Sequence, residues 1–300
     1  MKTITCIGHI TRDHIVTPTS DVSMPGGTTY YFSYGINALL KSSPRSAASV
    51  SYRLVASLAE SDMKSVDDMR AEGIDVTVVP SRETVFFENI YGADSNNRRQ
   101  QVLAKADPFT LSSIRDIKAD YIVLGSLLAD DFPLDVVRYL HGRGTVVLDA
   151  QGYLREVRGT SVVACPWSGK DDFLRYIDIL KVNEHEAEVL TGEHDLRRAA
   201  MMLHEQGVRE VLLTLGSYGS MVAADGNLYD IPVVPERQKV DATGCGDSYV
   251  LGYLYRRAQG DSPRDAALFA SAVATVNIEA HGPFRATEAG VLSRLREMGL

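Results

Sequence analysis

Two aspartates bracket a short run with two glycines near the carboxyl end of the chain. Asp241-Ala-Thr-Gly-Cys-Gly-Asp247 is followed at once by an apolar segment with helical spacing. A helix N-terminus presents unpaired backbone amides and a partial positive charge, so it favours anions. Gly244 and Gly246 let the backbone approach a ligand without obstruction by a Cβ atom. The run therefore predicts an anion-binding loop at the start of a helix.

Asp247 requires a separate explanation, because a carboxylate beside a bound phosphate is repulsive. A general base that takes a proton from an attacking hydroxyl group would provide one. Amides aimed at a phosphoryl group and a carboxylate aimed at the nucleophile allow phosphoryl transfer by positioning and electrostatics. The alternative is that Asp241 and Asp247 only cap the helix, and the run by itself does not decide between the two.

Other motifs for phosphate or nucleophile chemistry are incomplete. Gly169-Lys170 is followed by Asp171 and lacks the upstream glycine of a Walker loop. The Gly244-x-Gly246 pair lacks the third glycine of a dinucleotide fingerprint and lies far from the first strand. Cys245 lies at a helix start, where a thiolate can be activated, but no base is evidently placed for it.

Composition excludes several classes of function. The chain has 300 residues, 45% hydrophobic and 23% charged, which is ordinary for a globular protein with one large core. A net charge of −8 argues against a nucleic-acid-binding face but not against a local phosphate site. There is no apolar run of bilayer-spanning length, no signal peptide, and no disulfide or metal spacing among the three cysteines. We therefore expect a cytoplasmic protein without nucleic-acid or membrane partners.

Short β-branched runs alternate with amphipathic segments along most of the chain. The predicted strands are Thr3–Ile7, Tyr52–Ser57, Val76–Val79, Tyr121–Leu124, Thr145–Leu148, Ile177–Lys181 and Glu210–Thr214. The predicted helices are Asp62–Glu72, Leu134–His141, Glu184–Leu190, Leu196–Gln206, Gly246–Ala258, Pro263–Glu279 and Thr287–Glu297. Several strands are apolar on both faces, as buried parallel strands are. The alternation predicts one α/β domain over residues 1–300, with a mostly parallel sheet covered by helices on both faces.

One segment interrupts this alternation. Residues 83–107 contain two extended runs joined by a polar loop at Asp94, Ser95, Asn96 and Asn97, which is a hairpin signal. A hairpin inserted into an α/β core is a candidate lid over a cleft. The alternative is an ordinary edge hairpin.

The run from Asp241 to Asp247 resembles the C-terminal signature of the ribokinase-like, PfkB-type carbohydrate kinases. Three other stretches are similar to elements of that family in order and spacing, over about residues 3–285. They are Asn183-Glu-His-Glu186, Thr214-Leu-Gly-Ser-Tyr-Gly219, and Gly8 to Asp13 followed by Pro25-Gly26-Gly27. The resemblance implies a ribokinase-like core with a small β lid, contributed mainly by about residues 10–30 and 83–107.

The resemblance also implies roles on the phosphate side of the site. Asp247 would be the general base, and the backbone amides of Gly244, Cys245 and Gly246 would bind the transferring phosphate. Asp241 would help to hold that loop and a nearby cation site. The resemblance implies ATP and Mg²⁺ as cofactors and allows a monovalent cation such as K⁺.

Further residues would bind the donor and its metal. Asn183 and Glu186 would organise Mg²⁺ and its waters, because hard cations prefer oxygen ligands. The alternative is that Glu186 only lies on a solvated face of a helix. Residues of the second motif, Thr214, Gly216 and Gly219, would line ATP, and Asn277 would border the adenine. A plain strand-to-strand turn would explain the two glycines as well.

On the acceptor side, Asp13, Gly26 and Gly27 would contact the hydroxyl groups of the substrate. A carboxylate suits a polyol because it accepts hydrogen bonds from neighbouring hydroxyls. Asp13 as a turn or cap residue is the alternative.

The chain departs from many family members after the paired glycines. Residues 28–34 are rich in aromatic side chains where small residues and an Asn are common, which argues against ribose and fructose phosphates as acceptors. Residues 151–155 and 102–107 are similar to plant-type myo-inositol kinases of the family. We therefore expect a neutral cyclitol or sugar as the acceptor, and the family also allows a homodimer through the lid.

Three alternatives remain open at this level. A nucleoside kinase of the same family is expected if the aromatic run Tyr30–Phe32 stacks on a base. A ligand sensor would bind sugar or nucleotide without turnover. A hydrolase dependent on Cys245 would be inactivated by thiol reagents and would not need ATP.

Overall fold

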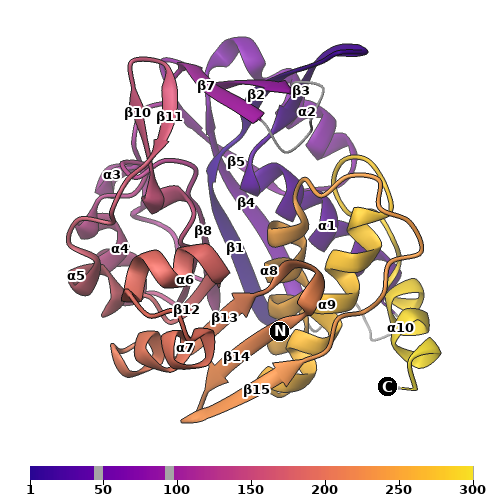
Figure 1. The fold of residues 1–300 in the computed structure, drawn as a ribbon. Helices are drawn as coiled ribbons and strands as arrows, with labels where there is room; N and C mark the ends of the chain where they lie inside the picture. The colour runs from indigo at the N-terminus through magenta and orange to yellow at the C-terminus, as the bar shows by residue number, and fades with distance from the viewer. Residues whose placement is uncertain (44–49, 92–97, 300) are drawn as a thin grey trace.

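The computed structural model describes residues 1–43, 50–91 and 98–299. In these ranges the chain forms a large sheet with helices on both faces and a smaller sheet at one end of it (Figure 1). None of the helices described is both long and apolar enough to cross a membrane.

The large sheet has the strand order β15-β14-β13-β12-β9-β8-β1-β4-β5 among the described residues. From β13 to β5 all neighbours are parallel, whereas β14 and β15 add an antiparallel edge. The strands are β1 (Lys2–His9), β4 (Val50–Leu58), β5 (Val76–Pro80), β8 (Tyr121–Gly125), β9 (Thr145–Asp149), β12 (Ile179–Asn183), β13 (Glu210–Thr214), β14 (Ser220–Ala224) and β15 (Asn227–Ile231). The central strands are buried on both faces, which explains their uninterrupted apolar runs.

Helices pack on both faces of this sheet and form two separate apolar cores (Figure 1). One core contains α1 (Thr28–Ser42), α2 (Lys64–Ala71), α8 (Cys245–Ala258), α9 (Pro263–Ile278) and α10 (Glu288–Glu297). The other contains α3 (Leu111–Ile114), α4 (Leu134–His141), α5 (Lys170–Leu174), α6 (Glu184–Thr191) and α7 (Leu196–Glu205). Short 3₁₀ turns are η1 (Glu60–Asp62), η2 (Gly152–Leu154) and η3 (Gly216–Tyr218). The predicted α/β fold is confirmed, and every predicted strand and helix has a counterpart whose ends differ by no more than two residues.

The smaller sheet has the order β10-β11-β7-β6-β2-β3 in the part of the chain described. Its strands are β2 (Thr11–Thr17), β3 (Ser20–Gly26), β6 (Val85–Tyr91), β7 (Arg98–Ala104), β10 (Arg155–Arg158) and β11 (Ser161–Ala164). β6 and β7 form the antiparallel hairpin predicted for residues 83–107, while its loop at Asp94–Asn97 lies outside the described residues. The hairpin of β10 and β11 is an addition that the sequence did not predict.

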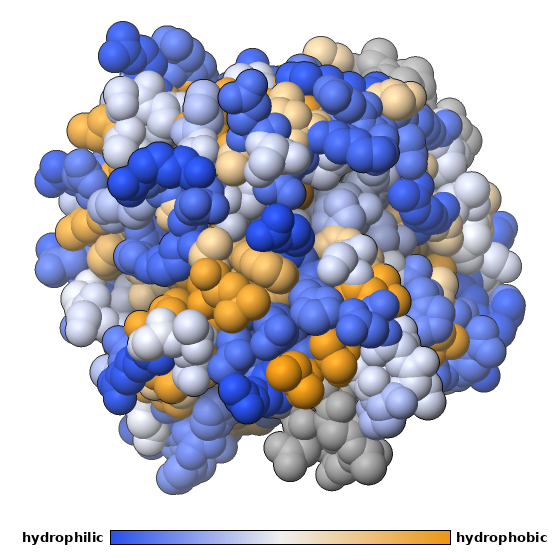
Figure 2. Space-filling model, turned by 90° about the horizontal axis from the view of Figure 1, so that it is seen from above, coloured by the Kyte–Doolittle hydropathy of each residue, from blue (hydrophilic) through white to orange (hydrophobic). Residues whose placement is uncertain are grey.

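The smaller sheet lies beside a small apolar core of its own, formed by Val85, Phe87, Val102, Leu127 and Leu128. Seen from this end, the molecular surface is mainly hydrophilic, with apolar residues gathered near the middle of the view (Figure 2). That this sheet acts as a lid stays a prediction.

Helix α1 was not predicted, because its first turns are rich in β-branched and aromatic residues with modest helix propensity. Packing overrides that propensity: Phe32, Ile36 and Leu39 are fully buried in the first core. Gly27 starts the helix with a φ of 90°, and its carbonyl accepts hydrogen bonds from the two amides of Tyr30 and Tyr31. Glycine adopts this backbone conformation without strain.

The carboxyl ends of the parallel strands converge below the smaller sheet. His9 ends β1, Asp149 ends β9, Asn183 ends β12 and Thr214 ends β13, so the predicted motifs meet at one edge of the large sheet. Ligands of open α/β sheets bind at this edge.

Candidate active site

The predicted anion-binding loop forms the start of α8. Gly244 is the N-cap with φ of 73° and ψ of 6°, a left-handed conformation that favours glycine. The amide of Cys245 donates to the carbonyl of Ala242 at 3.2 Å, so this amide is already engaged. Of the three predicted amide donors, Gly244 and Gly246 are therefore the better candidates for binding a phosphate.

Asp247 lies in the first turn of α8, and its carboxylate accepts a hydrogen bond from the hydroxyl of Thr28 at the start of α1. Burial raises the pKa of Asp247 to about 7, and the nearby Asp149 carboxylate adds to the rise. Thr28, Lys181 and Arg155 oppose it. A carboxyl group that titrates near neutral pH is suited to general base catalysis.

A buried lysine lies directly under the loop. The Lys181 ammonium is 2.9 Å from Asp149 Oδ2 and 3.9 Å from Glu186 Oε2. A Cβ atom placed on Gly246 would lie 3.3 Å from the same ammonium, so its positive charge adjoins the predicted phosphate position. Burial by itself would lower the pKa of Lys181, but the carboxylates of Asp149 and Glu186 outweigh it and raise the pKa.

Sequence reasoning missed Lys181, Asp149 and Arg155 as members of this site. A signal was present, because a lysine within a strand buried on both faces is rarely tolerated without a charged partner. Its partner could not be identified, since Lys181 and Asp149 face one another only because β12 and β9 are neighbours.

Asn183 and Glu186 form a reciprocal cap on α6. The Asn183 side chain accepts from the Glu186 amide at 2.8 Å, and the Glu186 carboxylate accepts from the Asn183 amide at 2.8 Å. Glu186 is only 6% exposed, so the solvated helix face considered as its alternative is wrong. Burial and the Asp149 carboxylate raise the pKa of Glu186. The pair therefore has a structural role whether or not it also binds a cation.

The acidic side chains at this edge of the sheet are possible oxygen ligands for Mg²⁺. No group of three His, Cys, Asp or Glu side chains in the described ranges is arranged to hold a metal ion. Three carboxylates, those of Asp149, Glu186 and Asp247, adjoin the loop and are balanced only in part by Lys181 and Arg155. This arrangement fits a hydrated cation that enters with donor phosphates, not a cage of protein ligands.

Asp241 holds the loop before α8. Its Oδ1 atom accepts from the Thr243 amide at 2.9 Å, and its own amide donates to the Ile278 carbonyl at 3.1 Å. Its Oδ2 atom lies 3.7 Å from Nδ1 of His281. These contacts agree with the loop-holding role expected of Asp241, while its part in a cation site stays a prediction.

Asn277 lies behind the same loop. Its amide nitrogen donates to the Thr243 carbonyl at 3.1 Å and to Cys245 Sγ at 3.7 Å. The side chain is 2% exposed, and its Oδ1 atom is buried without a hydrogen-bond partner among the described atoms. The structure thus places Asn277 as a support of the anion-binding loop, and an additional contact with adenine stays a prediction.

The predicted nucleotide loop connects β13 to its antiparallel neighbour β14. Thr214 Oγ1 donates to the Val182 carbonyl at 3.4 Å, and Gly216 and Gly219 have φ values of 54° and 94°. A Cβ atom on Gly219 would overlap the Ile231 carbonyl oxygen. Both glycines are thus explained by the turn, as the alternative held, and nucleotide binding remains a separate prediction.

The acceptor residues Asp13, Gly26 and Gly27 are brought together. Asp13 Oδ1 accepts from the Thr11 hydroxyl at 2.6 Å, and a Cβ atom on Gly26 would lie 2.8 Å from Asp13 Cγ. A Cβ atom on Gly27 would lie 2.8 Å from the His9 carbonyl oxygen. The paired glycines therefore let β3 and α1 pass close to the end of β1 and to the Asp13 carboxylate.

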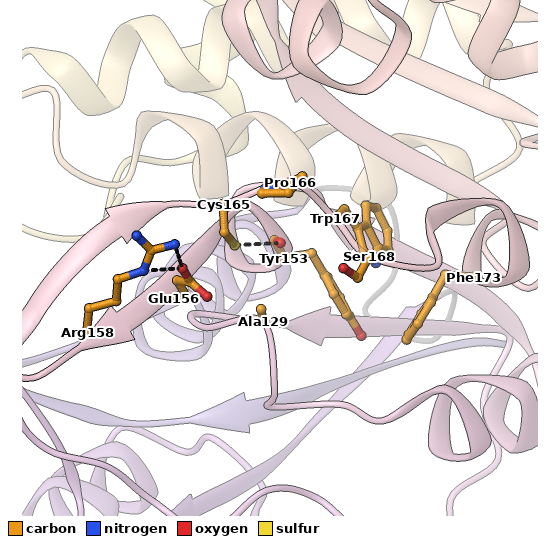
Figure 3. Close-up of a pocket in the computed structure, with 9 residues that line it drawn as sticks. All are labelled: Ala129, Tyr153, Glu156, Arg158, Cys165, Pro166, Trp167, Ser168 and Phe173. Carbon is orange, nitrogen blue, oxygen red and sulfur yellow. Dashed lines mark hydrogen bonds and ion pairs between the residues drawn. The ribbon is translucent and has the colours of Figure 1, made fainter.

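A separate hollow of about 400 Å³ lies between the β10–β11 hairpin and the loop before α5 (Figure 3). Tyr153 and Trp167 stack there with ring centroids 4.4 Å apart, and Arg158 pairs with Glu156. None of the residues predicted from the sequence as site residues lines this hollow. It is therefore distinct from the edge where the motifs meet.

Comparison with known proteins agrees with this geometry. The family model described as pfkB family carbohydrate kinase matches residues 118–289, which is more than half of the chain. A ribokinase of Haemophilus influenzae is 27% identical over 300 residues, covering 94% of either chain. A cytidine kinase of Thermococcus kodakarensis is 36% identical over 86 residues, covering 28% of this chain and 31% of the relative.

Two solved structures extend the likeness over the whole fold. One is a sulfate complex of a pyrophosphate-dependent kinase in the ribokinase family, 29% identical with a TM-score of 0.82, covering 94% of this chain and 97% of that one. Another is a pyrophosphate-dependent kinase in the ribokinase family complexed with a pyrophosphate analog and myo-inositol. It is 27% identical with a TM-score of 0.81, covering 99% of this chain and 100% of that one. The predicted ribokinase-like fold and the likeness to myo-inositol kinases are confirmed.

Proposed function

This chain belongs to the pfkB family of carbohydrate kinases, and we propose that it transfers a phosphoryl group to a hydroxyl group of a small neutral polyol. As a ribokinase-family kinase it is a phosphotransferase. Its acceptor, its donor and its catalytic residues are proposed below. Asp247 is proposed as the general base, and the amides at the start of α8 as the phosphate-binding donors.

The observation that carries the proposal is the position of Asp247 at the N-terminus of α8, with the ammonium of Lys181 close to the neighbouring Gly246. A phosphoryl group bound at the helix start is stabilised by its amides and by Lys181. The carboxylate of Asp247 is then placed to take the proton of an attacking hydroxyl. Helix capping alone does not explain a buried lysine at this point.

A neutral acceptor fits the side of the site where Asp13 lies. Carboxylates accept hydrogen bonds from adjacent hydroxyls but repel a second anion. One structure similar to this chain contains myo-inositol, which has hydroxyls on every ring carbon. We therefore propose a cyclitol such as myo-inositol, with a neutral sugar as the next candidate.

ATP is the first proposed donor, because Thr214, Gly216 and Gly219 resemble the nucleotide loop of the family. Pyrophosphate is the second, and it is favoured by the likeness to kinases described as pyrophosphate-dependent. The loop and Lys181 would bind the phosphates of either donor. When bound with the donor, Mg²⁺ would neutralise phosphate charge, and Asn183 and Glu186 are the residues proposed to hold its waters.

The alternatives gain less support. In the aromatic run Tyr30–Phe32, Phe32 is fully buried and Tyr30 packs on Tyr34 with ring centroids 4.8 Å apart. Only Tyr31 of this run contacts the anion-binding loop, at Gly244. The run is therefore poorly placed to stack on the base of a nucleoside, which argues against a nucleoside kinase. Burial raises the pKa of the Cys245 thiol to about 11, which disfavours a hydrolase with a thiolate nucleophile. A sensor that binds its ligands without turnover would not require a carboxyl group whose pKa is raised to about 7, as that of Asp247 is.

Phosphoryl transfer can be followed by ³¹P NMR with Mg-ATP or Mg-pyrophosphate and each of myo-inositol, ribose and cytidine. The proposal predicts acceptor-dependent transfer to a neutral polyol from at least one donor, and its loss in Asp247→Asn. Transfer to cytidine alone would favour the nucleoside kinase. Binding of donor and acceptor without any transfer would favour the sensor.

A further inference from the structure

Tyr31 differs from its aromatic neighbours in what it contacts. It lies in the first turn of α1 and is 6% exposed, and its ring packs on Gly244, the N-cap of α8. A Cβ atom added to Gly244 would overlap this ring and would lie 2.8 Å from Tyr31 Cε1. The ring therefore forms a wall directly beside the anion-binding loop.

Three carboxylates from three parts of the chain act on the Tyr31 hydroxyl. Burial raises the pKa of Tyr31, and the carboxylates of Asp241, Asp13 and Asp247 raise it further. They belong to the loop before α8, to β2 and to α8. A tyrosine hydroxyl is protonated at neutral pH with or without this rise, so the phenol is a hydrogen-bond donor among groups that mainly accept.

The same turn of α1 connects the acceptor side of the site to the phosphate side. Thr29 Oγ1 donates to the His9 carbonyl at 2.7 Å, and Thr28 hydrogen-bonds to Asp247. Gly27 precedes both and adjoins the end of β1. A side chain fixed at this turn is placed between Asp13, expected to hold the acceptor, and Asp247, expected to deprotonate it.

We propose that Tyr31 is the specificity-determining residue that selects an uncharged polyhydroxylated acceptor. The inference rests on the proposed function. Hydroxyl groups of such an acceptor donate to the carboxylates, while one of its oxygens accepts from the Tyr31 phenol. An acceptor that carries a phosphate or carboxylate is repelled by the carboxylates of Asp241, Asp13 and Asp247 around the Tyr31 phenol, and is rejected.

The test compares Tyr31→Phe, which keeps the ring on Gly244, with Tyr34→Phe as a matched control one turn further along α1. Tyr34 packs on Tyr30 and lies under Arg285, away from the carboxylates of the site. Steady-state kinetics with myo-inositol are expected to show a KM raised about tenfold in Tyr31→Phe, with kcat and the KM of the donor nearly unchanged. Tyr34→Phe is expected to match the wild type.

Tyr31→Asn removes the wall as well as the phenol. The ratio of kcat/KM for myo-inositol to that for the anionic acceptor 2-dehydro-3-deoxygluconate is expected to fall at least tenfold in this variant. Tyr31 variants with the KM and the acceptor preference of the wild type would overturn the inference.

Binding measurements keep this inference separate from the proposed function. If the wild type binds myo-inositol in calorimetry but transfers no phosphate to it, the proposed function fails. Weaker binding by Tyr31→Phe than by Tyr34→Phe would then still support the role of Tyr31. Equal binding by both variants, or no binding of myo-inositol to the wild type, would overturn it.

Discussion

The ammonium of Lys181 and the carboxylate of Asp149 lie 2.9 Å apart at the carboxyl ends of two neighbouring parallel strands. The pair is buried below the N-terminus of α8, where Lys181 also approaches Glu186. A buried ion pair is costly to desolvate and is weak evidence for stability. Its position beside the predicted anion-binding loop would let Lys181 act on a bound phosphate, as proposed above.

Lys181→Met should separate the structural and functional parts of this pair. The variant leaves Asp149 and Glu186 buried without their cation, so we expect a loss of about 3 kcal/mol in the free energy of unfolding, measured by urea denaturation. Adding Asp149→Asn to Lys181→Met should restore part of the stability but not the rate of phosphoryl transfer. A double variant with wild-type activity would show that Lys181 does not act on the phosphate.

The rate of transfer should depend on the protonation of Asp247. Because its pKa is about 7, kcat/KM should rise with pH between about 6 and 8 and then level off. Asp149→Asn removes a like charge and leaves more of the Lys181 charge uncompensated, and both changes lower the pKa of Asp247. The midpoint of the pH profile should therefore move to lower pH, and an unchanged or higher midpoint would contradict the assignment.

The same pKa has a consequence for stability. The folded pKa of Asp247, about 7, lies above the ordinary value of 3.8, so the folded protein disfavours the ionised carboxylate. The unfolded chain binds fewer protons at this group between these two values, and stability is lost as pH rises through them. Asp247→Asn should therefore raise the Tm at pH 8 and change it little at pH 4. Asp116, which is exposed in the connection between α3 and β8, serves as the control, since Asp116→Asn should leave the Tm unchanged at both pH values.

Gly244→Ala tests the contact between α8 and α1. The substitution meets a φ of 73° and the buried ring of Tyr31. We expect a loss of about 3 kcal/mol in stability, of which about 1 kcal/mol comes from the backbone conformation. Gly192→Ala is the matched control, because Gly192 has a φ of 70° and no atom within 4 Å of an added Cβ. Equal losses in the two variants would show that the ring of Tyr31 can move aside.

Glu186 can be tested without removing the cap of α6. In Glu186→Gln an amide oxygen can still accept from the Asn183 amide, so the free energy of unfolding should change by less than about 1 kcal/mol. If Glu186 also holds the waters of Mg²⁺, the Mg²⁺ concentration for half-maximal activity should rise about tenfold in this variant. Glu186→Ala should lose both stability and activity. A normal Mg²⁺ dependence in Glu186→Gln would show that Glu186 only caps α6 and does not act on Mg²⁺.

Much of the fold and part of the site could be predicted from the sequence. The alternation of strands and helices is local. The motifs that contain the anion-binding loop, Asn183 with Glu186, and the glycines beside Asp13 are each recognisable within a few residues, although the reciprocal cap of Asn183 and Glu186 was not predicted. Helix α1 could not be predicted, because burial of Phe32 and Ile36 stabilises it against the modest propensities of its first turns.

The missed site residues depend on contacts between distant segments. Lys181 meets Asp149 because β12 lies next to β9, and strand order cannot be read from periodicity. Tyr31 meets Gly244 because α1 packs against α8. The contact of Asn277 with adenine stays a prediction. Its hydrogen bond to the Thr243 carbonyl could not be predicted, because it depends on the loop before α8 lying against the end of α9.

The proposed mechanism depends on Asp247 accepting the proton of the acceptor hydroxyl. The most direct test is the kcat of Asp247→Asn with the best acceptor and donor, together with the Kd of that acceptor for the same variant. We expect kcat to fall by about 10³-fold or more while the Kd changes by less than about threefold, because the lost group acts in the transition state. A variant that keeps kcat within tenfold of the wild type would contradict the assignment of Asp247 as the general base.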